Sequence, residues 1–251
     1  MLYVYGLDVR DFSDRKTEEH SLEEFGREDK YTKTYASLLS WQRMEQLQRL
    51  KQSKDQMRCI GAGILEWYGL NCLCQSQVPP ETAVGENGKP YFLEFPVLQY
   101  NLSHAGDYVV AAFSDEPVGI DIAERRVCKD SLIRRCLTET EMDWLKHQEQ
   151  RDEAFCRLWA GKESFVKWTG HGLRKNLRQV EITLDGAFFV RDLNPGEMAS
   201  DGGKPLDRAY LREWREPRGY SVCVCCGDAK QLENVREIHW VTARELESLV
   251  I

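Results

Sequence analysis

The chain has 251 residues, of which 42% are hydrophobic, and this is enough for one large globular domain or two of ordinary size. Its net charge of −7 argues against a nucleic-acid binder, because such proteins carry a dominant basic surface. The first apolar stretch, Leu2 to Leu7, is interrupted by Gly6 and is too short for a signal peptide or a membrane span. We therefore expect a cytoplasmic protein without membrane contact.

The N-terminal part predicts a strand, an acidic loop and two helices. A strand is expected from Leu2 to Val9, and residues 11–29 hold eight acidic and three basic side chains without a regular period, which is typical of a solvated loop. Ser40 is a typical N-cap for a first helix, and a second helix is expected to stop at Gly69. These helices carry a local surplus of basic residues, which suits an anionic ligand: Arg43, Arg49, Lys51, Lys54 and Arg58.

The remaining elements alternate between strands and helices, and together they predict an α+β fold. Residues 76–90 are expected to form a loop, and Asp185-Gly186 is typical of a hairpin turn. Strands are expected at residues 108–113, 118–122, 181–184, 187–191, 210–214 and 220–225, and helices at 129–136, 139–148 and 152–168. The nine cysteines are interpreted as buried thiols of a reducing compartment.

The strand from Val118 carries a carboxylate on its second face. Val118, Ile120 and Ile122 alternate with other residues, so a strand directs these aliphatic side chains to one side and Asp121 to the other. An ionised carboxylate in such an apolar strand needs a cation, an arginine or several hydrogen-bond donors. Asp121 is therefore a candidate for a functional residue, although a structural role stays open.

A predicted helix carries a second charged face. Trp159, Glu163 and Lys167 are spaced four residues apart and share one side of this helix. A Glu four residues before a Lys is most often a surface ion pair. Together with Asp121, however, the two carboxylates and the lysine are sufficient to hold a divalent cation against a phosphate ester.

These two segments resemble the signature motifs of the 4′-phosphopantetheinyl transferases of the surfactin-synthetase type. The first is Gly119-Ile120-Asp121-Ile122-Ala123, and the second runs from Trp159 through Lys162-Glu163-Ser164 to Lys167. Three further segments fit in the same order: Gly88-Lys89-Pro90, Asn101-Leu102-Ser103-His104 and Gly170-His171-Gly172-Leu173. The resemblance covers nearly the whole chain.

The resemblance implies two similar α+β halves, related by a pseudo-twofold axis, with coenzyme A between them. The N-terminal half, residues 1–116, would hold the adenine and 3′-phosphate side of coenzyme A, and residues 117–251 would hold the metal site and the signature helix. The implied reaction transfers the 4′-phosphopantetheine arm of coenzyme A to a serine of an apo carrier protein of acyl, peptidyl or polyketide type. It depends on Mg²⁺ and releases adenosine 3′,5′-bisphosphate. The enzyme is expected to be a monomer.

The resemblance also assigns roles to individual residues. Asp121 and Glu163 would hold Mg²⁺, with Glu163 also acting as general base, and Lys167 would neutralise the pyrophosphate. The remaining coenzyme A contacts are expected from His104 and Ser103 at the phosphates, from Lys89 and Pro90 at the adenine, and from Lys54 and Arg58 at the 3′-phosphate. Lys162 is expected near the phosphate with a lesser role. The basic turn His171 to Arg178, with Arg174 and Lys175, would suit an acidic carrier or would simply be solvated.

One position departs from the family pattern. Ala123 stands where the family usually has a second acidic residue, so a water would have to complete the metal shell, and Glu124 points to the other side of a regular strand. Two alternatives follow. The first is a divergent member that binds coenzyme A or a carrier with little transfer, and the second is an unrelated magnesium phosphohydrolase.

Overall fold

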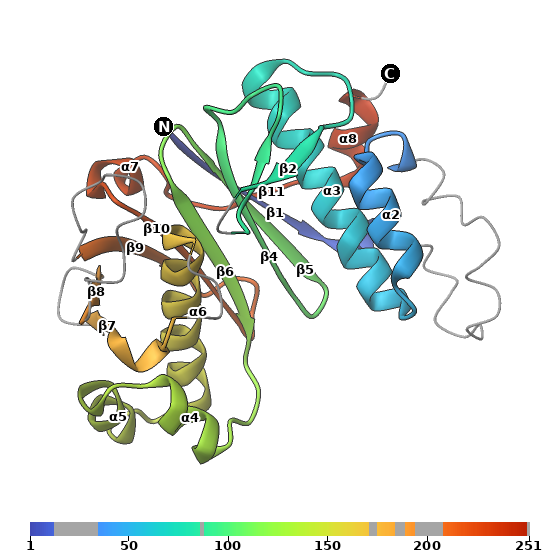
Figure 1. The fold of residues 1–251 in the computed structure, drawn as a ribbon. Coiled ribbons are helices and arrows are strands. Elements are labelled where there is room, and N and C mark those ends of the chain that lie inside the picture. The colour runs from blue at the N-terminus through green and yellow to red at the C-terminus, as the bar shows by residue number, and fades with distance from the viewer. Residues whose placement is uncertain (13–34, 86–87, 171–174, 184–188, 194–207, 250–251) are drawn as a thin grey trace.

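In the computed structural model, two sheets lie side by side and each is covered by one long helix (Figure 1). The structure describes residues 1–12, 35–85, 88–170, 175–183, 189–193 and 208–249. The strands of these residues are β1 (Leu2–Asp8), β2 (Thr82–Val84), β3 (Pro90–Phe92), β4 (Gln99–Ala105), β5 (Tyr108–Ser114), β6 (Val118–Glu124), β7 (Val180–Thr183), β8 (Phe189–Asp192), β9 (Arg208–Trp214), β10 (Tyr220–Cys226) and β11 (His239–Trp240). The helices are α2 (Trp41–Arg49), α3 (Ser53–Cys74), α4 (Asp130–Cys136), α5 (Glu139–Lys146), α6 (Arg151–Thr169), α7 (Ala229–Glu233) and α8 (Ala243–Leu249), with short 3₁₀ turns η1 (Val9–Phe12) and η4 (Leu177–Gln179).

The strand order separates the chain into two sheets. The first sheet has the order β11-β1-β5-β4, the second has the order β6-β10-β9-β8-β7, and β2 and β3 form a separate hairpin. Strand β11 pairs with β1 in parallel, so residues 239–240 lie on the first sheet although they come near the end of the chain. The mixed helices and sheets confirm the α+β class, and the division at residues 116 and 117 stays a prediction.

Helix α3 is longer than the sequence indicates. Gly69 was expected to end it, but the helix continues to Cys74 and is capped by Gln75, whose φ is 57°. Gly69 instead allows close packing, because a Cβ there would lie 2.6 Å from Cε2 of Phe113 on β5. The expected N-cap of the preceding helix is confirmed: the Ser40 side chain accepts a hydrogen bond from the Arg43 amide at 3.1 Å.

The β2–β3 and β7–β8 hairpins test two further expectations from the sequence. The loop expected at residues 76–90 is wrong in part, because Thr82–Val84 pairs with Pro90–Phe92. The hairpin is confirmed in its strands, since Glu181 pairs with Arg191, but its turn lies outside the described residues. Most of the acidic segment 11–29 also lies outside the described residues.

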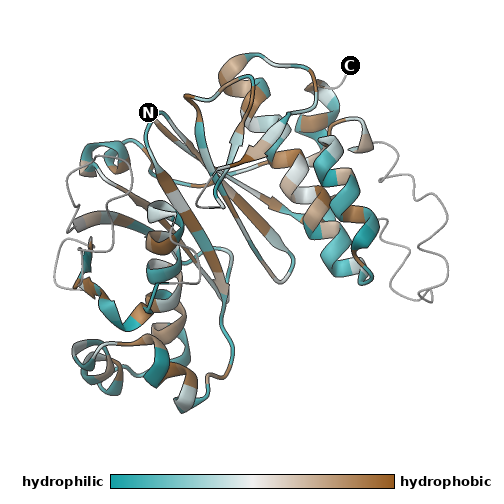
Figure 2. Cartoon of the chain, viewed as in Figure 1, coloured by the Kyte–Doolittle hydropathy of each residue, from teal (hydrophilic) through white to brown (hydrophobic). Residues whose placement is uncertain are grey.

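All nine cysteines are free, and six of them are buried. Figure 2 shows hydrophobic residues along the central strands and hydrophilic ones over much of α2.

The edge strands β4 and β6 join the two sheets and position the charged residues. The Ile120 amide donates a 2.9 Å hydrogen bond to Asn101 Oδ1, which connects the two strands through a buried side chain. Ile120 belongs to a core shared by both sheets, whereas Ala123 packs in the core under α6. The predicted alternation along β6 is therefore confirmed, and it directs Asp121 toward α6.

Helix α6 lies very close to β6. A Cβ at Gly119 would lie 2.9 Å from Trp168 Cα, and it would lie nearer still to the Ser164 carbonyl oxygen and the Trp168 nitrogen. Only a glycine permits this approach of a helix backbone to a strand. The close contact sets the depth at which the charged face of α6 meets the strand.

Candidate functional site

A cavity of about 510 Å³ collects most of the charged residues that the sequence singled out. Strand β6 and helix α6 form two of its walls, and the others come from α3, the end of β4 with the turn after it, and the segment that leads from β6 into α4. The predicted site residues that line it are Arg58, His104, Asp121, Glu163 and Lys167, together with Trp159, Ala123 and Glu124. Five separate predictions therefore meet in one place.

Asp121 is held by two donors at the bottom of this cavity. Its side chain is almost fully buried, and its Oδ1 accepts hydrogen bonds from Lys167 Nζ at 2.7 Å and from Ser103 Oγ at 2.7 Å. Lys167 also donates to the Ile120 carbonyl at 3.1 Å. The buried carboxylate thus has the partners that its charge requires. Ser103 lies beside the cavity and positions Asp121.

Glu163 is the second carboxylate of the cavity, one helical turn before Lys167. Burial raises the pKa of Glu163, the negative charge of Asp121 raises it further, and the charge of Lys167 opposes this. Two carboxylates whose charges repel each other in a partly buried site are a suitable ligand pair for a cation. Mg²⁺ commonly takes one or two carboxylates and completes its shell with water and phosphate oxygens, so this pair fits Mg²⁺. No described residues form a group of three or more His, Cys, Asp or Glu side chains that could hold a metal.

Arg58 and His104 bring a positive charge and an imidazole ring to the same cavity. Arg58 pairs with Asp55 on α3 and donates to the Gly106 carbonyl at 3.1 Å, while its buried Nε has no partner among the described residues. Burial lowers the pKa of His104, and the charges of Arg58 and Lys167 lower it further. The imidazole of His104 is therefore neutral at pH 7 and retains one N–H donor.

Other predicted binding residues lie outside this cavity. Lys54 is exposed on α3, one turn before Arg58. Lys89 Nζ donates to the Val118 carbonyl at 2.9 Å, and burial lowers its pKa to about 8. Pro90, the first residue of β3, also lies away from the cavity lining. The adenine role of Lys89 and Pro90 stays a prediction.

Two basic residues are taken up by buried ion pairs. Lys162 contacts Glu141 at 2.6 Å and donates to three backbone carbonyls, so its expected place near the phosphate is wrong. Lys175 is buried and pairs with Asp192 at 2.9 Å, so it does not belong to an exposed basic turn. Arg178 is exposed, and residues 171–174 lie outside the described ranges.

The sequence did not indicate several residues of the cavity wall, namely Arg126, Cys128, Leu132, Phe155 and Cys156. Arg125 and Arg126 follow directly after the strand that carries Asp121. This pair of basic residues could have indicated Arg126 from the sequence. Glu124, which a regular strand directs away from Asp121, is the last residue of β6 and lines the cavity as well. Ala123 lies in the same wall and offers only a methyl group.

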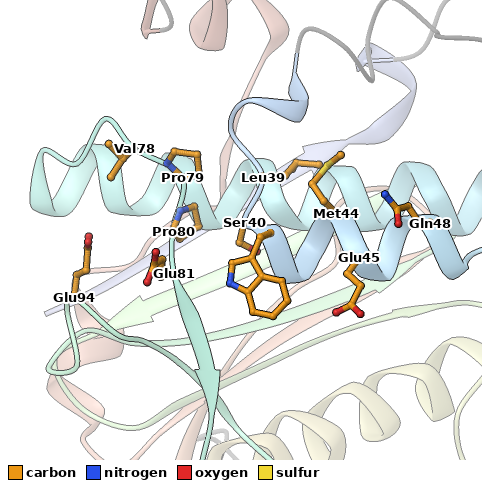
Figure 3. Close-up of a pocket in the computed structure, with 11 residues that line it drawn as sticks. Leu39, Ser40, Met44, Glu45, Gln48, Val78, Pro79, Pro80, Glu81 and Glu94 are labelled. Carbon is orange, nitrogen blue, oxygen red and sulfur yellow. The ribbon is translucent and has the colours of Figure 1, made fainter.

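A larger cavity lies elsewhere and has the wrong charge for a phosphate. Its volume is about 650 Å³, and it is formed by the start of α2 and the segment before β2 (Figure 3). The described residues of the lining include Glu45, Glu81 and Glu94, and none of them is a Lys, Arg or His. Three carboxylates without a cation disfavour a phosphate ester. The smaller cavity beside Asp121 is therefore the better candidate.

None of the described helices has the length and apolar character that crossing a membrane requires. The candidate site is a cavity between the two sheets, with carboxylates, basic groups and aromatic side chains on its walls.

Residues 117–225 match the model of the 4′-phosphopantetheinyl transferase superfamily. The 4′-phosphopantetheinyl transferase ffp of Bacillus subtilis is 26% identical over 81% of this chain and 89% of its own length, and Sfp of B. subtilis strain 168 is 25% identical over 82% and 90%. The transferase psf-1 of Bacillus pumilus is 43% identical over 42% of this chain and 47% of its own. A solved structure, the Thermotoga maritima holo-[acyl-carrier-protein] synthase, has 23% identity and a TM-score of 0.35, covering 43% of this chain and 61% of its own. The chain is thus similar to 4′-phosphopantetheinyl transferases over residues 117–225 and, at 25–26% identity, over about four fifths of its length, and this similarity supports a transferase enzyme.

Proposed function

We propose that this enzyme transfers the 4′-phosphopantetheine arm of coenzyme A to a serine of an apo carrier protein, with Mg²⁺, and releases adenosine 3′,5′-bisphosphate. The observation that carries this proposal is the meeting of Asp121, Glu163, Lys167, His104 and Arg58 in one cavity. The names of the relatives support the reaction type, because all three bacterial relatives described above are 4′-phosphopantetheinyl transferases.

Asp121 and Glu163 would hold the Mg²⁺ ion, which supplies positive charge for the pyrophosphate oxygens when it is bound. Lys167 would add a second positive charge at the same pyrophosphate, since its Nζ is already 2.7 Å from Asp121. His104, neutral at pH 7, would donate a hydrogen bond to a phosphate oxygen. The chain would thereby position the pyrophosphate and offset its charge, which is the main requirement of phosphoryl transfer.

Glu163 would take the proton of the carrier serine. The serine oxygen forms a bond to the phosphorus that carries the pantetheine, and the bond from that phosphorus to the bridging oxygen breaks. Adenosine 3′,5′-bisphosphate leaves with the electron pair of that bond. In the metal-free chain, burial and the charge of Asp121 raise the pKa of Glu163, whereas a bound Mg²⁺ would lower it, so the base role rests on the place of Glu163 in the cavity.

Arg58 would contact the 3′-phosphate of coenzyme A from the cavity wall, and Lys54 would contact it from the adjacent turn of α3. The exposed Arg178 keeps its proposed part in contacting the carrier. A cytoplasmic location and a monomeric state also stay predictions.

The decisive experiment incubates the protein with coenzyme A, Mg²⁺ and several apo carriers, and then measures the intact mass of each carrier. We expect the mass of the added arm on at least one carrier, with none when Mg²⁺ is chelated. The Glu163→Gln variant is the matched control. If coenzyme A binds but no carrier gains the arm at any Mg²⁺ concentration, the divergent binding protein with Ala123 is the better description. Hydrolysis of coenzyme A without a carrier would instead favour a phosphohydrolase.

A further inference from the structure

A third cavity, here named the arginine cavity, lies beside the end of β6. Its volume is about 470 Å³, and it is lined by the start of α6, the residue after β6 and the turn between β9 and β10. Four arginines from these three segments line it: Arg125, Arg157, Arg215 and Arg218. Cys156 lines both this cavity and the one that contains Asp121, so the two are neighbours.

Two of the four arginines are already neutralised. Arg157 makes a two-pronged contact with Glu213 at 2.7 and 2.9 Å. Arg125 contacts Glu153 at 3.3 Å. The carboxylates of Glu213 and Glu153 therefore account for these two guanidinium groups.

Arg215 and Arg218 differ from the other two. Both are exposed, and within the described part of the chain neither makes an ion pair. Glu216 is the remaining carboxylate among the described residues of the lining. These residues together with Glu213 therefore contain one more arginine than carboxylate. Like charges that gather without a partner repel each other, and an anion between them relieves this repulsion.

We infer that the arginine cavity is an oxyanion-binding site, in which Arg215 and Arg218 hold a carboxylate or a phosphate group. A guanidinium group presents parallel N–H donors that match the two oxygens of such anions. The arrangement provides two of these groups on one turn, in the same cavity as Arg125 and Arg157. The anion is either free phosphate or an acidic side chain of the protein substrate, and the second source rests on the proposed function.

The first experiment tests the site without any transfer reaction. Phenylglyoxal modifies accessible arginines, and a bound oxyanion protects them, so the rate of modification is followed at each residue by peptide mass spectrometry. Inorganic phosphate is the probe, and chloride at the same ionic strength is the reference. Arg236 is a suitable internal control, because it is exposed and lies outside this cavity. We expect phosphate to slow modification of Arg215 and Arg218 at least about 3-fold and to leave Arg236 unchanged, since exposed ion pairs are individually weak.

The second experiment identifies the source of the anion. The double variant Arg215→Gln/Arg218→Gln is compared with Arg236→Gln in steady-state transfer, with KM measured separately for coenzyme A and for the carrier. A rise of about 5-fold in the carrier KM, with the coenzyme A KM unchanged, assigns the anion to the protein substrate. An unchanged carrier KM together with phosphate protection assigns it to a free anion. Equal modification rates with phosphate and with chloride, combined with an unchanged carrier KM, would overturn the site. The protection experiment remains valid even if the protein transfers no arm, so the two proposals can fail separately.

Discussion

The substitution Gly119→Ala should push the signature helix away from the strand that carries Asp121. The new Cβ would lie 2.9 Å from Trp168 Cα, whereas nonpolar atoms pack best at about 3.5 Å or more. Helix α6 would therefore have to move back by more than about 0.5 Å, and the obstructing atoms are backbone atoms that cannot rotate away. Overpacking of this kind costs about 3 kcal/mol. For a chain of this size, the corresponding fall in Tm is about 6–12 °C.

The displacement should also reduce transfer, because Glu163 and Lys167 move with the helix. A misplacement approaching 1 Å can cost about 10²-fold in rate. The assays are thermal unfolding and single-turnover transfer at saturating coenzyme A. Gly161→Ala is the matched control on the same helix, since the nearest described atoms to its Cβ would be side-chain atoms of Ile182 and Leu211 at 3.2 and 3.5 Å. If Gly119→Ala has the Tm and rate of Gly161→Ala, the close contact does not position the site.

Four further predictions concern individual residues of the cavity. Burial and the charge of Asp121 raise the pKa of Glu163 above its ordinary 4.5, so ionisation of Glu163 lowers the free energy of unfolding at pH 7. This loss of stability is absent below pH 4.5 and complete above the raised pKa. Without Mg²⁺, Glu163→Gln should therefore raise Tm at pH 7 by about 1–3 °C, and a lower Tm would contradict this sign. In the transfer assay with Mg²⁺, the same variant should lower turnover about 10²-fold or more. Asp121→Asn should lose transfer and recover part of it at higher Mg²⁺, whereas indifference to Mg²⁺ would make Asp121 structural. Ala123→Glu should lower the Mg²⁺ concentration needed for half-maximal transfer by about 2- to 10-fold, and an unchanged requirement would exclude this position from the metal shell. Replacing Lys54 and Arg58 by Ala should weaken binding of coenzyme A about 10-fold more than binding of its 3′-dephosphorylated analogue, measured by calorimetry, and equal weakening would move the 3′-phosphate site elsewhere.

Local sequence patterns predicted the helices and strands better than they predicted which side chains contact each other. The alternation in β6 placed Ile120 and Asp121 on the correct faces, because a strand has a fixed period of two. The predicted end of α3 at Gly69 was wrong. A glycine can end a helix or allow a close contact within it, and here the contact with Phe113, which is distant in sequence, explains the glycine. A pattern of neighbouring residues contains no information about such a contact.

The candidate site was predictable mainly through the resemblance. It indicated Asp121 and Glu163, which line one cavity, whereas spacing alone favoured a surface ion pair for Glu163 and Lys167. In the structure, Lys167 contacts Asp121 on β6. The same limit explains the error at Lys162, which is fixed by Glu141 of another helix. Partners far apart in sequence decide the role of each lysine.

The hydrogen bond between Asn101 and Ile120 spans the line where the two sheets meet. His104 comes from one side of that line and Glu163 from the other, so neither side contains a complete cavity. The C-terminal strand β11 pairs with β1 of the first sheet and thereby connects the two sheets a second time. The chain could be cut in the short turn between β5 and β6. The rate of transfer would then measure the fraction of the two fragments that had reassembled. Proteins fused to the fragments would bring them together, so the rate would measure the association of those proteins.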